Sequence, residues 1–242
     1  MKEKHAFNRT YYNKVWRFSP FFDPQGWGSW KIIQELLGKK NLELGPGTKP
    51  KIPLKGNFFI DISERVVQRL QQRGAYASFS DLSEKLPFPD EHFDLVCAFE
   101  LLEHTPNDLS ILQEMSRVLK TEGHALISFP VNMEYWCGVD EAVGHIRRYQ
   151  PETIESMAQS AGLKIVQYAI LPVPWPGKYT GFLLGTIGKI FPWFFSFFQD
   201  LIDKSPFTTL KQPIHLEPWG QNSWMDAKKA TTIFLVAVKE RS

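Results

Sequence analysis

The feature that most constrains the fold is a repeated alternation of short apolar runs with segments patterned as helices. The nearly continuous apolar run at residues 93–99 is typical of a strand that is buried on both faces. The alternation predicts an α/β domain with a mostly parallel sheet and helices on both faces. We expect strands at residues 41–44, 57–60, 76–79, 93–99, 124–129, 163–171 and 231–238, and helices at residues 8–16, 29–37, 63–72, 107–119 and 151–161.

The composition fits one such domain with two additions. A chain of 242 residues suits a single α/β domain better than two. Aromatic residues, 14% of the chain, concentrate in two regions that also hold several prolines. We therefore predict an N-terminal aromatic helical cap at residues 1–38 and a sheet domain at residues 39–242, with an irregular aromatic insertion at residues 172–230.

Charge and cysteine content exclude several classes of protein. The formal net charge is +2 and no basic stripe is present, so we expect no nucleic-acid partner. Cys97 and Cys137 form neither a metal nor a disulfide pattern, which predicts no metal site. The first residues lack the apolar segment of a signal peptide, which favours a cytoplasmic location.

Acidic side chains stand at the ends of four consecutive predicted strands: Glu43, Asp61, Asp81 and Glu100. The carboxyl ends of parallel strands meet at one edge of a sheet, where ligands bind near the switch in strand order. Asp61 can accept hydrogen bonds from both hydroxyls of a ribose. Asp81 can accept one from an adenine amine, and the backbone N–H of Leu82 can serve a ring nitrogen. These residues predict a nucleoside site.

The loop after the first strand indicates which nucleoside cofactor binds. A dinucleotide site needs glycine at the first, third and sixth positions, followed by a helix that holds the pyrophosphate. Here Pro50 takes the sixth position, Pro53 follows, and Asp61 comes only eighteen positions after Glu43. The prolines oppose a helix in that short link. S-adenosylmethionine carries no phosphate, and its positive sulfonium suits a crevice rich in carboxylates.

The ordered set of motifs over residues 40–170 resembles the class I S-adenosylmethionine-dependent methyltransferases, especially the subgroup with small-molecule, quinone and lipid or glycan-precursor substrates. The motifs are Glu-Leu-Gly-Pro-Gly-Thr at 43–48, Asp61, the segment 81–90, Phe-Asp-Leu-Val at 93–96, and residues 100–104. The resemblance implies a Rossmann-like, doubly wound, seven-stranded sheet whose last strand pairs antiparallel between the fifth and sixth.

The resemblance also implies which residues contact the cofactor. The methionine and ribose part would lie against Glu43, Gly45, Pro46 and Gly47. Asp61 and Ile62 would flank the ribose, Asp81 and Leu82 the adenine, and Phe99 and Glu100 the methionine end. The chain departs from the family at Lys49, where a third glycine usually stands, so we expect a loop or single turn there in place of the family's first helix.

Catalytic candidates lie in the loop at residues 144–149 and after the fourth strand. Methylating a hydroxyl requires removal of a proton, and His145 is a candidate base. The resembling subgroup commonly has His-x-Arg-Tyr here, which adds Tyr149, and it often keeps a histidine at the position of His104. Arg147 or Arg148 could hold an anionic acceptor. Alternatively, the loop is a solvated basic segment paired with Glu134, Asp140 or Glu141, and His104, which follows Glu103, is structural.

Two aromatic segments leave their roles open. Tyr11, Tyr12 and Trp16 form either a lid over the pocket or a simple packing contact. Residues 179–202 approach the length of a membrane span, but Lys189, Pro192 and three glycines interrupt them. They could form a lid, an interfacial helix in peripheral membrane contact, or a dimer surface, so both monomer and homodimer remain open.

The residues therefore favour a methyltransferase that acts on a small or lipid-like acceptor. The alternative is a non-catalytic module that binds S-adenosylmethionine or a partner on the same fold. A nicotinamide-dependent oxidoreductase is disfavoured by Pro50 and by the absent phosphate-binding helix.

Overall fold

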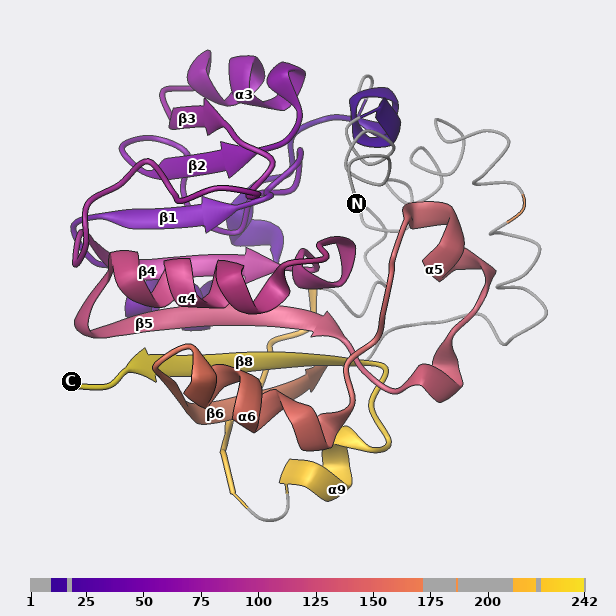
Figure 1. Ribbon diagram of the computed structural model, residues 1–242. Helices are drawn as coiled ribbons and strands as arrows, with labels where there is room; N and C mark the ends of the chain where they lie inside the picture. The colour runs from indigo at the N-terminus through magenta and orange to yellow at the C-terminus, as the bar shows by residue number, and fades with distance from the viewer. Residues whose placement is uncertain (1–9, 17–18, 172–185, 187–210, 221–222, 242) are drawn as a thin grey trace.

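A computed structural model describes residues 10–16, 19–171, 186, 211–220 and 223–241 (Figure 1). The described chain forms one eight-stranded sheet in the order β3-β2-β1-β4-β5-β8-β6-β7. The strands are β1 Asn41–Leu44, β2 Phe58–Asp61, β3 Tyr76–Phe79, β4 Phe93–Phe99, β5 Leu119–Pro130, β6 Leu163–Leu171, β7 Glu217–Pro218 and β8 Thr232–Lys239. The α-helices are α2 Trp30–Leu36, α3 Glu64–Gln71, α4 Asp108–Val118, α5 Gly138–Val143, α6 Pro151–Ser160 and α9 Ser223–Ala227, and residues 10–15 are also helical.

The strand directions confirm the predicted Rossmann-like topology. β1 pairs parallel with β2 and β4, and the parallel set continues to β3 on one side and β5 on the other. β8 lies antiparallel between β5 and β6, as the resemblance implied. The predicted count of seven strands is one too low, because a two-residue strand, β7, pairs with β6 at the edge. So short a segment carries no readable alternation of apolar and polar residues.

The strand expected at residues 124–129 is part of a longer strand. β5 starts at Leu119, and Glu122 adopts a left-handed φ of +64° within it. The pairing with β4 shifts register in the same region. The pairing with β4 passes from Leu119 directly to His124, so residues 120–123 form an irregularity of the β-bulge type within the strand.

Two apolar cores hold the helices to the sheet. On the face seen in front in Figure 1, α4 and α6 pack over β4, β5 and β8, with Phe93 fully buried. On the opposite face, Ile33 of α2 and Leu70 of α3 pack against Phe59 of β2. Helices on both faces match the prediction.

The link from β1 to β2 contains no helix, as expected from its prolines. Residues 45–57 run instead through consecutive turns. Ile52 of this link is fully buried and belongs to the same core as α2 and α3, so the loop itself covers part of the sheet. The first turn after β1 is therefore free of a helix N-terminus, which is where a pyrophosphate would bind.

The aromatic segment at residues 179–202 lies outside the described residues except for Thr186. Among the described residues, no helix is both long and apolar enough to cross a bilayer.

Candidate functional site

The candidate site lies where the loops after β1, β2, β3 and β4 meet. β1 pairs with β2 on one side and β4 on the other, so the chain reverses its direction of winding beside β1. Figure 1 shows the arrowheads of β1, β2 and β4 pointing toward the same edge of the sheet. This is the edge at which open α/β sheets bind ligands.

Two glycines after β1 adopt backbone conformations that other residues rarely accept. Gly45 has φ +64° and Gly47 has φ +55°. A Cβ on Gly45 would lie 2.8 Å from Leu101, and one on Gly47 would lie 2.7 Å from Trp16. The loop therefore requires glycine at both positions, because a side chain would clash with Leu101 or Trp16.

Asp61 joins the loops that follow β1 and β2. Its Oδ2 accepts a hydrogen bond from the Gly47 N–H at 2.9 Å, and its Oδ1 accepts one from the Ser63 N–H at 2.8 Å. Burial raises the pKa of Asp61 to about 6, although these two backbone bonds favour the ionised form. A carboxylate oxygen can accept more than one hydrogen bond, so Asp61 keeps acceptor capacity for a ribose hydroxyl.

Glu43 faces the loop backbone. Its Oε2 accepts hydrogen bonds from the Lys51 N–H at 2.9 Å and the Ile52 N–H at 3.1 Å, and the residue is 1% exposed. Burial raises the pKa of Glu43 to about 7. The structure thus shows Glu43 shaping the link from β1 to β2, whereas the sequence predicted a direct contact with the cofactor.

The loop after β3 has internal hydrogen bonds of its own. Asp81 Oδ1 accepts from the Ser83 N–H at 3.0 Å and the Ser83 hydroxyl at 2.6 Å. Leu82 has a left-handed φ of +60°, and its N–H donates to the Ser80 hydroxyl at 3.0 Å. The Leu82 N–H predicted to serve an adenine ring nitrogen already has an acceptor in the chain.

Phe99 and Glu100 lie at the carboxyl end of β4, and Phe99 lines a cavity. Glu100 has φ +47°, its side chain is exposed, and its Oε1 accepts a hydrogen bond from the Ser128 hydroxyl at 2.8 Å. Desolvation of its carboxyl group by the surrounding protein raises the pKa of Glu100. Phe99 turns to the α2 face and stacks on Phe234, with ring centroids 5.8 Å apart.

A cavity of about 490 Å³ opens beside Phe99 and Ser128. That volume is in the range of small-molecule sites. Its wall is mostly aromatic and aliphatic, with a few charged groups. The residues that line it include Trp27, Lys51, Phe99, Tyr168, Ile214 and Phe234.

The N-terminal helical stretch covers the glycine loop. Trp16 packs on Gly47, and Tyr12 stacks on Trp16 with centroids 6.0 Å apart. Arg69 of α3 holds the end of this stretch by donating to the Trp16 carbonyl at 2.9 Å and the Ser19 carbonyl at 2.8 Å. The structure shows the packing contact, which lies directly over the glycine loop. The lid role stays a prediction.

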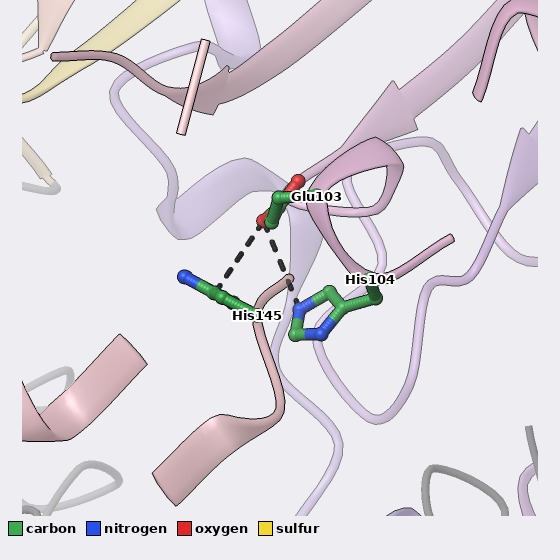
Figure 2. A group of neighbouring side chains, drawn as sticks. All are labelled: Glu103, His104 and His145. Atoms are coloured by element: carbon green, nitrogen blue, oxygen red, sulfur yellow. Dashed lines mark ion pairs between the residues drawn. The ribbon is translucent and has the colours of Figure 1, made fainter. Parts of the chain in front are cut away.

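His145 and His104 converge on a buried acid, Glu103, in the 3-10 turn η2 (Leu102–His104). Figure 2 shows both imidazole rings beside its carboxylate. Each Nε2 lies 3.7 Å from Glu103 Oε1, and the ring centroids are 4.6 Å apart. His145 Nδ1 lies 2.8 Å from Oδ1 of Asp140 in α5. Burial, reinforced by His145, lowers the pKa of His104 well below its usual value.

The other candidates from this loop make structural contacts. Arg148 is buried and binds Asp140 through Nε at 2.9 Å and Nη2 at 3.0 Å. Arg147 pairs with Asp108, and the buried Tyr149 hydroxyl donates to the same carboxylate at 2.8 Å. Burial, together with Asp108, raises the pKa of Tyr149 above its usual value.

Sequence reasoning missed the acids that organise this loop. Asp140 was considered only as a partner for a basic loop, and Glu103 only as the neighbour of His104. The signal that could have found Glu103 is an acid inside a mostly apolar segment, Leu101-Leu102-Glu103, directly after a buried strand.

Comparisons with known proteins agree with this architecture. A family model described as a methyltransferase domain matches residues 43–127, which contain the glycine loop and Asp61. The chain is similar to 27-O-demethylrifamycin SV methyltransferase of Amycolatopsis mediterranei, with 28% identity over 41% of this chain and 47% of the relative. It is also similar to phosphatidylethanolamine N-methyltransferase of Cereibacter sphaeroides, with 30% identity over 37% of this chain and 50% of the relative.

A solved structure shares the fold across nearly the whole chain. A SAM-dependent methyltransferase of Thermotoga maritima, described as a possible histamine N-methyltransferase, superposes with a TM-score of 0.58 at 15% identity, over 98% of this chain and 91% of that one. The curated relatives are matched over half of their length or less.

The fold is Rossmann-like, and residues 43–127 match a methyltransferase domain. The chain is similar to S-adenosylmethionine-dependent methyltransferases.

Proposed function

We propose that this chain transfers a methyl group from S-adenosylmethionine to a small or lipid-like acceptor. The observation that carries the proposal is the hydrogen bond from Gly47 N–H to Asp61 Oδ2, which joins the two loops at the switch in strand order. That bond places bare backbone and a carboxylate on one crevice, as a nucleoside with a ribose requires.

The residues present fit the cofactor. Gly45 and Gly47 adopt the left-handed conformations that shape the loop after β1. The hydroxyl of Thr48 is fully buried and makes no hydrogen bond within the described residues, so it is available to a polar group bound at the loop. Asp61 would accept from the ribose. Phe99 and Glu100 would border the methionine end.

When bound, the cofactor supplies an electrophilic methyl group on a positive sulfonium. The chain positions the acceptor in line with that methyl group and excludes water. The N-terminal aromatic stretch serves the second task, because Trp16 and Tyr12 already cover the glycine loop.

Of the three predicted catalytic residues, His145 is the one we propose as general base for a hydroxyl acceptor. Asp140 Oδ1 lies 2.8 Å from its Nδ1, which fixes the ring and leaves Nε2 to accept a proton. Tyr149 is buried and its hydroxyl donates to Asp108, so we assign it a structural role. His104 also lies in contact with Tyr12, which favours a structural role there.

The cavity beside Phe99 supports an apolar acceptor. Its aromatic and aliphatic walls suit an apolar body, while Lys51, His215 and Asp226 supply a few polar contacts. Two of the similar proteins are named for a rifamycin and for phosphatidylethanolamine as substrates, which also favours an acceptor of this kind.

Calorimetry with S-adenosylhomocysteine tests the cofactor site. We expect binding by the native chain and binding at least tenfold weaker by Asp61→Ala, with Asp23→Ala as the matched control because Asp23 caps the short helix η1 (Pro24–Gly26), outside the crevice. An equal affinity for the two variants, or no binding by the native chain, would contradict the proposal.

A transfer assay tests catalysis separately. With tritiated S-adenosylmethionine, we expect label in apolar acceptors that have a nucleophilic head group and little in fully hydrophilic ones. Tight binding with no transfer to any acceptor would instead support the non-catalytic module.

A further inference from the structure

We propose that Glu103, His104 and His145 form a binding site for a divalent transition-metal ion such as Zn²⁺. Their ligand atoms lie within 4.8 Å of one another, and Figure 2 shows the ion-pair lines from both histidines meeting at the Glu103 carboxylate. This inference reverses the expectation of no metal site, which rested on cysteine spacing alone. It concerns cation binding, and its test does not depend on methyl transfer.

The first argument is the state of Glu103. The residue is 0% exposed, and neither carboxylate oxygen makes a hydrogen bond within the described part of the chain. A buried carboxylate without donors is costly, and the usual remedies are an ion pair, protonation or a bound cation. The nearest positive candidates are the two imidazoles, each 3.7 Å away.

The second argument is the orientation of the histidines. Both direct Nε2 at the same oxygen, Glu103 Oε1. A tetrahedral zinc ion with ligands at about 2.0–2.2 Å would hold the ligand atoms about 3.3–3.6 Å apart. The two distances from nitrogen to Glu103 Oε1 are 3.7 Å, and all the ligand atoms lie within 4.8 Å, so small side-chain rotations would close the set around an ion. Imidazole and carboxylate are ligands that zinc accepts readily.

The third argument is the acid behind His145. A metal-bound histidine usually donates its other ring N–H to a carboxylate, which fixes the ring and strengthens the ligand. Asp140 occupies that position, 2.8 Å from Nδ1. Arg148 in turn binds both oxygens of Asp140, so this supporting acid is itself held in place.

The fourth argument is charge. Glu100 and Asp140 both act electrostatically on Glu103, and Arg148 is the permanent cation that opposes them. The cluster therefore has an excess of carboxylates, which a divalent ion would offset.

The hydroxyl of Tyr12 is compatible with an ion. It lies 3.1 Å from His104 Nε2 and also 3.2 Å from the Val143 carbonyl, so it can keep the carbonyl and release the nitrogen. Three protein ligands leave a coordination position open, as in catalytic zinc sites. Ligation would use the same Nε2 lone pair of His145 that base catalysis uses, so the two roles exclude each other at that atom.

The test is direct titration of the full chain with Zn²⁺ after removal of metal with a chelator. We expect one ion per chain, measured by calorimetry and by elemental analysis. Glu103→Gln keeps the shape of the side chain and removes its charge, and His145→Gln removes a nitrogen ligand. Each should weaken Zn²⁺ binding by at least the 10- to 100-fold that loss of a supporting residue costs.

The control is His92→Gln, which changes a histidine outside the cluster and should leave affinity within about twofold. Co²⁺ gives a second readout, because its visible absorption bands should appear with the native chain and disappear with Glu103→Gln. Thermal unfolding without metal checks that the variants fold. Weak or absent binding by the native chain, or equal binding by native chain and Glu103→Gln, overturns the proposal.

Discussion

The hydroxyl of Tyr12 lies 3.1 Å from Nε2 of His104, which connects the N-terminal helical stretch to the turn after β4. The same hydroxyl donates to the Val143 carbonyl at the end of α5. One side chain from the cap thus contacts both segments that carry the predicted catalytic histidines. The helical stretch at residues 10–16 is therefore held beside the glycine loop by specific polar contacts as well as by aromatic packing.

Tyr12→Phe should loosen the cap. The variant loses both polar contacts, and a typical hydrogen bond contributes about 1 kcal/mol. We expect a fall of about that size in the free energy of unfolding and about fivefold faster release of S-adenosylhomocysteine. Stopped-flow fluorescence measures the release. The control is Tyr135→Phe, because Tyr135 is one of the exposed aromatics. Equal release rates for the two variants would argue against a cap held by Tyr12.

Cofactor affinity should depend on the charge of Asp61. Burial raises its pKa to about 6, and the carboxylate is the form that accepts from a ribose. Between pH 7.5 and pH 5 the ionised fraction falls, so binding should weaken about tenfold. Calorimetry across this range checks the prediction. Asp61→Asn cannot ionise and should show weak binding with little pH dependence. A native chain whose affinity is constant from pH 7.5 to 5 would contradict the assignment.

The same pKa shift should lower the stability of the chain without cofactor as the pH rises, whereas it should raise the affinity for the cofactor. Between pH 4 and pH 6 the native state holds a proton on Asp61 that the unfolded state releases. The contribution of this group to stability therefore decreases as the pH rises through that window. Chemical unfolding of native chain and Asp61→Asn across the window should show a difference in slope of this sign.

Gly47→Ala should damage the crevice more than an ordinary glycine replacement. The new Cβ would lie 2.7 Å from Trp16, at a φ of +55°. Gly56 is the matched control, since its φ is +80° but no atom lies within 4 Å of its Cβ position. Both variants carry the left-handed penalty of about 1–2 kcal/mol. Only Gly47→Ala should also displace Trp16, seen as a shift in tryptophan fluorescence and as weaker S-adenosylhomocysteine binding.

Asp140→Asn should unfold more easily than the native chain. It leaves the buried Arg148 without its carboxylate partner, and breaking a buried pair costs about 3–5 kcal/mol. The control, Glu152→Gln, breaks an exposed pair with Lys228 and should cost about 0–1 kcal/mol. Urea unfolding measures both. Similar losses in the two variants would mean that the Asp140 network contributes little.

Acid should act through the same residue. Burial opposes ionisation of Asp140, but hydrogen bonds from His145, Arg148 and Cys137 outweigh it and lower the pKa to about 2. A lowered pKa of this kind stabilises the native state above pH 4, and the contribution is lost as the pH falls toward 2. Asp140→Asn should lack that part of the acid dependence.

Much of the fold could be predicted from the sequence, because the spacing of apolar residues agrees with the pattern of buried residues in the strands. The runs at residues 41–44, 76–79, 93–99 and 163–171 match observed strands, since each is bounded by turn residues. β7 could not be predicted, because its two residues form a strand only by pairing with β6, which is distant in the sequence. The early start of β5 at Leu119 was not predictable, because Leu119 pairs with Phe93 of β4 across an irregularity at residues 120–123.

The positions of the site residues could be predicted from the sequence, but many of their side-chain contacts could not. The strand-end acids stand where the topology predicted, yet Glu43 binds the loop backbone of Lys51 and Ile52. Which way a carboxylate turns depends on donors that come close only after folding. The convergence of Glu103 with His145 spans 42 positions of sequence, and no local pattern encodes such a contact.

The position of β8 has a consequence for folding during synthesis. The glycine loop, Asp61 and the end of β4 all lie within the first hundred residues, so that half of the sheet can pair as it leaves the ribosome. β5 and β6 are made next, but each must wait for Thr232–Lys239 to fill the place between them. Until then two strand edges stay unpaired, which is the condition that invites aggregation or chaperone binding. The nascent chain thus acquires its nucleoside crevice early and closes its sheet late.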